Sequence, residues 1–77
     1  MTAKELNLAA RTVFAEAATE GLDGQMAVAQ TMYDQLYHNI IGAYGSGFGK
    51  TLEEVIQNAY TTPTEQDIRG SSCLEAV

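Results

Sequence analysis

The sequence is 77 residues long, which limits it to one small domain, and 45% of its residues are apolar, which argues against a disordered chain. Ten acidic residues oppose four basic ones, and the formal charge of −6 lacks the basic footprint that direct binding to nucleic acid needs. A single Cys and a single His argue against an internal disulfide and against a metal site built from these residue types, and we expect no cofactor.

The first residues, 1–5, contain no apolar segment of the kind found in signal peptides. No apolar run in the sequence approaches the ~20 residues that a membrane-spanning helix needs. We therefore expect synthesis in the cytoplasm without membrane insertion. Action at the cell wall would require release by another route.

The first predicted helix covers residues 3–19. Thr2 and Glu5 form a Thr-x-x-Glu capping box at its start, and Gly21 ends it. Apolar residues recur behind the box at helical spacing. They are Leu6, Ala9, Ala10, Val13, Phe14 and Ala17.

The second predicted helix covers about residues 24–38, with Asp23 as its N-cap. The link from the first helix is short, which predicts two antiparallel neighbours. The apolar stripe of this helix is Met26, Val28, Ala29, Met32, Tyr33, Leu36 and Tyr37.

Glycines concentrate in residues 39–50, which predicts a loop. A second capping box, Thr51-x-x-Glu54, opens a third helix over about residues 52–59, and Pro63 lies in the segment that breaks it. A third box, Ser72-x-x-Glu75, indicates a short helical stub at the end of the chain. A helix of that length has little stability alone, so we expect either that the chain is a fragment or that its end is frayed or borrowed by a partner.

Residues 45–51, Gly-Ser-Gly-Phe-Gly-Lys-Thr, partly resemble a phosphate-binding loop. That motif needs its first Gly at position 44, which is Tyr44, because successive backbone amides must curl around the phosphate. It also needs a preceding buried strand, which this chain does not offer. A glycine loop followed by a capped helix is the better interpretation.

Glu16 is the residue best suited to catalysis. It falls late in an otherwise apolar helix, beside Val13, Phe14 and Ala17, and Glu20 follows one turn later. Apolar neighbours favour the protonated form of a carboxyl group, which a general acid needs to protonate a glycosidic oxygen. The alternative is a carboxylate at the edge of the helix with its oxygens in water.

Three short segments, in order and at matching spacing, resemble the catalytic domain of the spore-cortex-lytic cell-wall hydrolase family. Members of that family carry Glu-Ala-Arg-Gly-Glu, then Gly-Gln-x-Ala-Val-Ala, then Thr-(Leu/Ile)-x-x-Val-Ile. The corresponding residues here are Glu16-Ala17-Ala18-Thr19-Glu20, residues 24–29 (Gly-Gln-Met-Ala-Val-Ala) and residues 51–56 (Thr-Leu-Glu-Glu-Val-Ile). The sequence departs from the pattern at Ala18 and Thr19, which replace Arg-Gly, and at Asp34, which replaces an Asn.

The capping boxes and periodicity predict an all-α domain over residues 1–77, made of three helices and a short C-terminal helical stub, and the resemblance implies that it is a lysozyme-like partial domain. The resemblance also implies cleavage of peptidoglycan glycan strands, as a muramidase or lytic transglycosylase, with Glu16 as the general acid and base. The residues that we expect to contact the substrate are Glu20, Gln25, Tyr33 and Tyr60. The family domain continues beyond this point, so we expect the domain to be incomplete.

Two other functions fit the composition. One is a small acidic binding protein, such as a phage-encoded inhibitor of a nucleic-acid-binding protein, that retains a hydrolase-like frame. Its acidic surface would comprise Glu53, Glu54, Glu65, Asp67 and Glu75. The other is a structural module that self-associates through its unfinished last helix.

Overall fold

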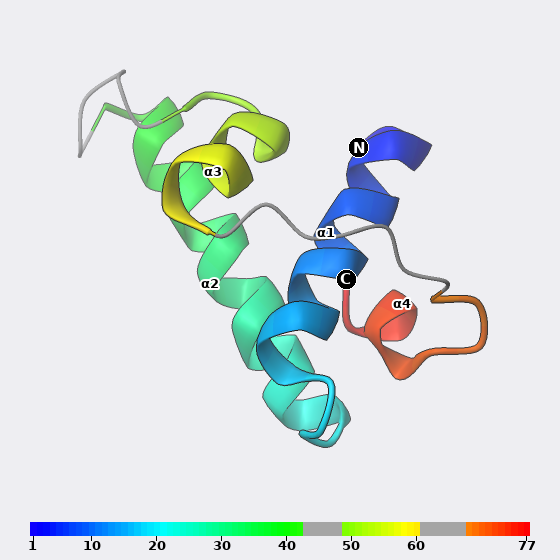
Figure 1. The fold of residues 1–77 in the computed structure, drawn as a ribbon. Coiled ribbons are helices and arrows are strands. Elements are labelled where there is room, and N and C mark those ends of the chain that lie inside the picture. Colours follow the sequence, from blue (N-terminus) through cyan, green and yellow to red (C-terminus); the bar gives the residue numbers. More distant parts are fainter. Residues whose placement is uncertain (43–48, 61–67) are drawn as a thin grey trace.

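The computed structural model of the chain describes residues 1–42, 49–60 and 68–77. These residues form four helices: α1 (Ala3–Ala17), α2 (Leu22–Ile40), α3 (Leu52–Ala59) and α4 (Ser72–Ala76). α2 runs back beside α1 as the second arm of a hairpin, with α3 and α4 placed at different parts of it (Figure 1). α3 and α4 each contact both arms but do not contact each other. The predicted all-α fold class is confirmed.

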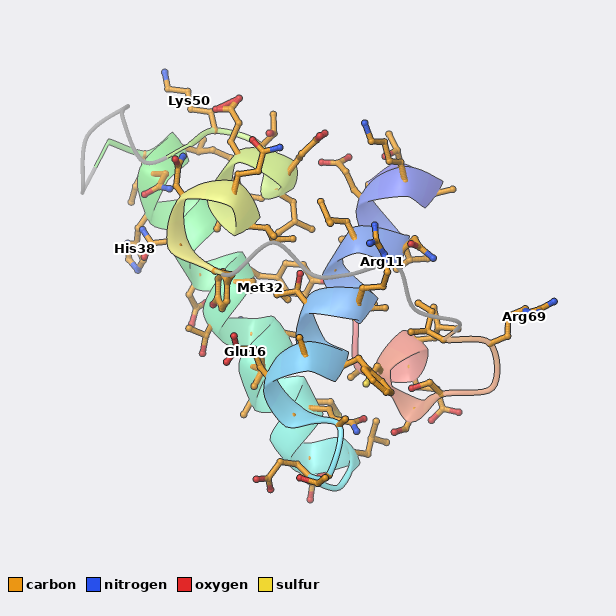
Figure 2. All side chains as sticks on the ribbon, in the orientation of Figure 1. Arg11, Glu16, Met32, His38, Lys50 and Arg69 are labelled. Atoms are coloured by element: carbon orange, nitrogen blue, oxygen red, sulfur yellow. The ribbon has the colours of Figure 1, made fainter. Side chains whose placement is uncertain are left out.

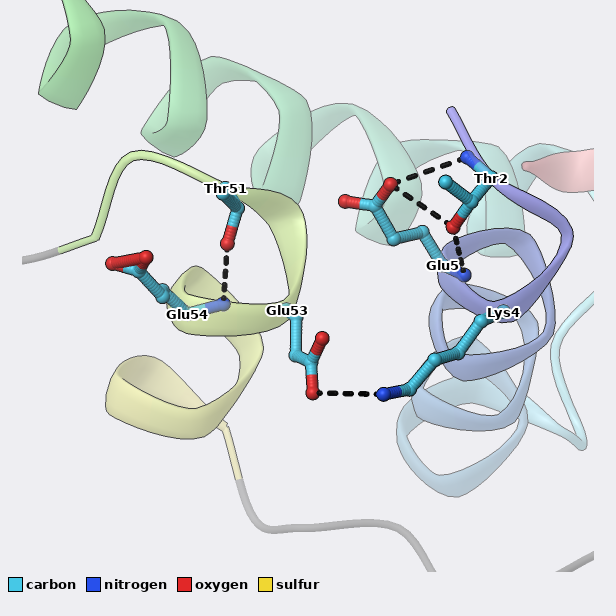
Figure 3. Close-up of polar contacts among 6 residues, drawn as sticks. All are labelled: Thr2, Lys4, Glu5, Thr51, Glu53 and Glu54. Carbon is cyan, nitrogen blue, oxygen red and sulfur yellow. Dashed lines mark hydrogen bonds and ion pairs between the residues drawn. The ribbon is translucent and has the colours of Figure 1, made fainter.

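The first helix begins at the predicted capping box. The Thr2 hydroxyl accepts a hydrogen bond of 3.1 Å from the Glu5 amide, and the Glu5 carboxylate accepts one of 3.2 Å from the Thr2 amide (Figure 3). An ion pair of 3.5 Å between Lys4 and Glu53 links this end of α1 to α3. Both side chains are solvent-accessible, so water and salt screen the pair and it adds little stability.

The third helix has the predicted bounds. The Thr51 hydroxyl accepts a hydrogen bond of 3.2 Å from the Glu54 amide, and the Glu54 carboxylate accepts one of 3.4 Å from the Lys50 amide. Gly49 precedes this cap with φ at +103°, and a Cβ atom there would lie 2.8 Å from the Cβ of Glu54. Only glycine fits such a backbone at this distance, so Gly49 allows the chain to turn closely onto α3.

The boundary between α1 and α2 differs from the prediction. The N-cap of α2 is Gly21, which makes no side-chain capping bond, and Asp23 lies inside the first turn. The reason is the buried side chain of Gln25, whose amide nitrogen donates to the carbonyl oxygens of Ala17 and Glu20. These two hydrogen bonds satisfy the carbonyl groups of Ala17 and Glu20, so α1 ends sooner and α2 begins earlier than the periodicity suggests.

The last helix also differs from the prediction. Its N-cap is Ser71, whose hydroxyl accepts from the Cys73 amide, whereas Ser72 is the first helical residue and bonds to Gln25. Cys73 is fully buried, and α4 packs on α1 and α2. The stub is therefore not frayed, because α4 packs on both α1 and α2, whereas its use by a partner stays a prediction.

The core combines small residues of α1 with larger ones of α2 and α3. Its buried members are Ala9, Ala10, Val13, Ala29, Met32, Leu52, Ile56, Ile68 and Cys73. Two residues predicted to face inward, Met26 and Tyr37, are instead 50% and 61% exposed. Apolar residues lie on several sides of α2. The helices α1, α3 and α4 cover only part of this apolar surface, so Met26 and Tyr37 stay exposed.

Candidate functional site

The proposed acid, Glu16, lies in the last turn of α1 and is exposed. Figure 2 shows its side chain leaving α1 toward the side of the molecule on which α3 ends. The expectation that neighbours such as Val13 and Ala17 would desolvate the carboxyl is not met, because those two residues face the core while Glu16 points outward. A general acid at this position would be dehydrated only by a substrate that covers it.

Tyr60 lies within electrostatic range of Glu16, although 44 positions separate them in the sequence. Tyr60 is the C-cap of α3 and is partly buried against the core cluster. Burial raises the pKa of its phenol, and the negative charge of Glu16 raises that pKa further. The Glu16 carboxylate therefore acts electrostatically on an aromatic ring that we expect to contact the substrate.

Glu20 lies in the link between α1 and α2 and is exposed. Its side chain rests against Gly24, where a Cβ atom would come within 2.9 Å of the Cβ of Glu20. Glycine at position 24 therefore allows the backbone of α2 to approach the Glu20 side chain closely. Glu20 remains accessible to a ligand at this end of the hairpin.

Gln25 and Tyr33 have internal partners. Gln25 is 2% exposed, and its amide oxygen accepts a hydrogen bond of 2.6 Å from the Ser72 hydroxyl. The Tyr33 hydroxyl donates to the carbonyl oxygen of Val77 at 3.1 Å, and burial raises the pKa of this phenol. Both residues hold α4 in place. Gln25 is too deeply buried to contact a substrate, which argues against its expected role in substrate binding.

A cavity of about 280 Å³ lies elsewhere, among the first turns of α1 and α3 and the middle of α2. Of the expected site residues, only Tyr33 lines it. Its other lining residues are Met1, Glu5, Leu36, Lys50, Thr51 and Leu52. Glu5 and Glu16 are about 16 Å apart along the axis of α1, so this cavity is separate from the Glu16 surface. Sequence periodicity could not reveal it, because three helices form its walls.

The acidic residues suggested for a binding surface do not gather within the described chain. Glu53 and Glu54 lie in the first turn of α3, whereas Glu75 lies on α4, and these two helices do not touch. Glu65 and Asp67 fall outside the described residues, as do positions 45–48 of the glycine-rich motif. Glu53, Glu54 and Glu75 therefore do not form one continuous acidic patch.

Within residues 1–42, 49–60 and 68–77, no three His, Cys, Asp or Glu side chains come together as metal ligands would. None of the helices in these ranges has the length and apolar character needed to cross a bilayer. No protein-family model, curated protein or solved structure significantly matches the chain.

Proposed function

We propose that this chain cleaves the glycan strands of peptidoglycan, with Glu16 as the general acid and base and Tyr60 as an aromatic surface for a sugar ring. The observation that carries the proposal is the electrostatic effect of the Glu16 charge on the Tyr60 phenol. The sequence pattern around Glu16 supplies the substrate class. Glu20 lies beyond the end of the same helix and is a candidate for a polar contact to the strand.

The accessibility of Glu16 suits a polymeric substrate. A glycan strand is long and must pass across an open surface, so its cleavage does not require an enclosed pocket. The bound sugars would exclude water from the carboxyl group. The ring of Tyr60 offers an apolar face for a sugar and a hydroxyl for a hydrogen bond.

In the transglycosylase route the reaction needs only one carboxyl group. Glu16 gives its proton to the glycosidic oxygen as the bond to the anomeric carbon breaks. In the transglycosylase route, a hydroxyl of the same sugar then attacks the anomeric carbon and its proton returns to Glu16. In the muramidase route, a water molecule takes the place of that hydroxyl.

The test compares the release of soluble muropeptides from purified peptidoglycan by the chain and by Glu16→Gln. The amide preserves the shape of the side chain but cannot give a proton, so the rate should fall by about 100-fold or more. Glu75→Gln is the matched control, because Glu75 is an exposed glutamate on α4, and it should keep full activity.

Tyr60 provides a second comparison. Tyr60→Phe keeps the ring and should retain most of the activity, whereas Tyr60→Ala should lower it about tenfold through weaker substrate binding. Circular dichroism must show that each variant is folded. A folded chain that releases no muropeptides, or equal rates for the chain and Glu16→Gln, would refute the proposal.

A further inference from the structure

α4 is held in place by tertiary contacts. It has five residues, which is too few for a helix to be stable alone. It packs on α1 and α2 and does not contact α3 (Figure 1). The helix can therefore leave its place without breaking any contact between α3 and the hairpin of α1 and α2.

Two side chains of α2 fix the two ends of α4. At the start of α4, the Ser72 hydroxyl donates to the amide oxygen of Gln25 at 2.6 Å. At its end, the Tyr33 hydroxyl donates to the carbonyl oxygen of Val77 at 3.1 Å. Cys73 lies between these bonds and is fully buried. The attachment of α4 therefore rests on a small number of contacts, with Cys73 among them.

Most of the core lies outside α4. Among the described residues, the buried core cluster has nine members, and seven of them lie on α1, α2 or α3. Cys73 is the member that α4 contributes. Release of α4 leaves the contacts among those seven residues in place. It should therefore cost less free energy than unfolding of the whole chain.

A pivot for such a release lies directly before α4. Gly70 has φ at +77°, which glycine adopts without strain. The Ser71 amide donates to the carbonyl oxygen of Ile68 at 2.9 Å and closes a tight turn around Gly70. No atom of the described residues lies within 4 Å of the place that a Cβ on Gly70 would take. Ile68 is buried, so the chain is anchored immediately before a turn that has room to move.

We propose that α4 is a hinged strap, which opens as a unit about Gly70 while α1, α2 and α3 stay folded. The open form is a minor population of the native protein. It exposes the Cys73 thiol and the surface of α1 and α2 beneath the strap, and the closed form excludes other molecules from that surface. Glu16 and Tyr60 lie outside α4, so the opening does not depend on the proposed catalytic function.

Thiol labelling tests the opening, because Cys73 is the one cysteine of the chain and is buried when α4 is closed. The probe is a chromogenic aromatic disulfide, and urea unfolding followed by circular dichroism gives the globally unfolded fraction. Without urea, Cys73 should react at least about tenfold faster than that fraction allows. The rate should rise only weakly with urea below the global transition, because opening of the strap exposes little surface. A rate that follows the unfolded fraction at every urea concentration would overturn the proposal.

Tyr33→Phe tests the bond at the end of the strap. It removes the hydrogen bond to Val77 and keeps the ring, so labelling without urea should become about fivefold faster. Tyr37→Phe is the matched control, since Tyr37 is an exposed tyrosine on the same helix, and it should leave the rate unchanged. An unchanged rate in Tyr33→Phe would contradict the role given to this bond.

Gly70→Ala tests the pivot. An alanine strains the closed turn, so labelling without urea should become about tenfold faster. Gly42→Ala is the matched control, because Gly42 has a similar φ of +83°, equal space for a Cβ atom and a position outside the strap. It should lower global stability but leave the labelling rate without urea unchanged. Equal acceleration by the two variants would mean that only global unfolding exposes Cys73, and the strap would be refuted.

Discussion

The Ser72 hydroxyl donates a hydrogen bond of 2.6 Å to the amide oxygen of Gln25, which lies 47 residues earlier in the chain. The amide nitrogen of Gln25 also donates to the carbonyl oxygens of Ala17 and Glu20. One buried side chain thus joins the end of α1 to the start of α4. Because α4 has only five residues and cannot be stable alone, its position depends on such contacts.

Gln25→Ala should destabilise the fold by about 2–3 kcal/mol, because it removes buried volume and leaves three polar groups without their partner. Ser72→Ala should cost about 1 kcal/mol. Urea unfolding measures both, with the exposed Gln57→Ala on α3 as a control that should change stability by less than about 0.5 kcal/mol. The double variant Gln25→Ala/Ser72→Ala should cost less than the sum of the two, and strict additivity would mean that the bond contributes nothing.

Gly49→Ala should destabilise the protein more than Gly42→Ala. Both glycines have positive φ, at +103° and +83°, so either substitution strains the backbone by about 1–2 kcal/mol. At position 49 the new Cβ would also meet Glu54 at 2.8 Å and the Val55 amide at 3.0 Å, whereas nothing lies within 4 Å at position 42. Thermal unfolding of the two variants checks the difference, and equal melting temperatures would show that the contact with α3 is unimportant.

Glu5 should make the free energy of unfolding depend on pH in the acidic range. Hydrogen bonds from the Thr2 amide and hydroxyl hold the pKa of Glu5 below its ordinary value of 4.5. The folded state therefore binds the proton more weakly than the unfolded state, so this contribution is present above pH 4.5 and is lost as the pH falls through the folded pKa. Melting temperatures of Glu5→Gln should fall less with pH in this range than those of the unmodified protein. Glu75→Gln is the control, and an identical acid profile for Glu5→Gln would contradict the prediction.

Glu16→Gln should lower the pKa of Tyr60, because it removes the negative charge that opposes ionisation of the phenol. The ultraviolet absorbance of tyrosinate follows this titration, with Tyr60→Phe identifying the signal. Tyr33 is the internal control, since burial is the cause of its raised pKa and the substitution should leave it unchanged. An unaltered titration of Tyr60 would mean that the two side chains are further apart in solution.

The same two tyrosines should make the protein sensitive to alkali. Their folded pKa values lie above the ordinary value of 10.0, so the folded state holds the protons more tightly than the unfolded state. Their contribution is complete below pH 10.0 and is lost as the pH rises through the folded values. The double variant Tyr33→Phe/Tyr60→Phe should lose less stability above pH 10 than the unmodified protein, as measured by urea unfolding.

Local sequence determined the elements whose stabilising groups are neighbours. The caps at Thr2 and Thr51 were predictable because a cap and its amide partner lie three residues apart, so no other part of the chain is needed to form them. The reciprocal bond of a full box forms only at Thr2, since the Glu54 carboxylate accepts from the Lys50 amide instead of the Thr51 amide. The all-α class followed from helical periodicity for the same reason. Asp23 and Ser72 had equally good local signals, but neither became a cap.

Tertiary structure decided those two positions and the candidate site. Gln25 receives the Ser72 hydroxyl and occupies the carbonyls that end α1, and neither contact is encoded in local spacing. Likewise, periodicity placed Tyr37 with the core, but the number of helices that cover α2 left it exposed. The sequence by itself determined where helices form, because backbone capping and periodicity are local. It also identified Glu16 as the candidate catalytic acid. Only the packing of α3 against the hairpin placed Tyr60 within electrostatic range of Glu16, because this relationship depends on how distant segments pack together.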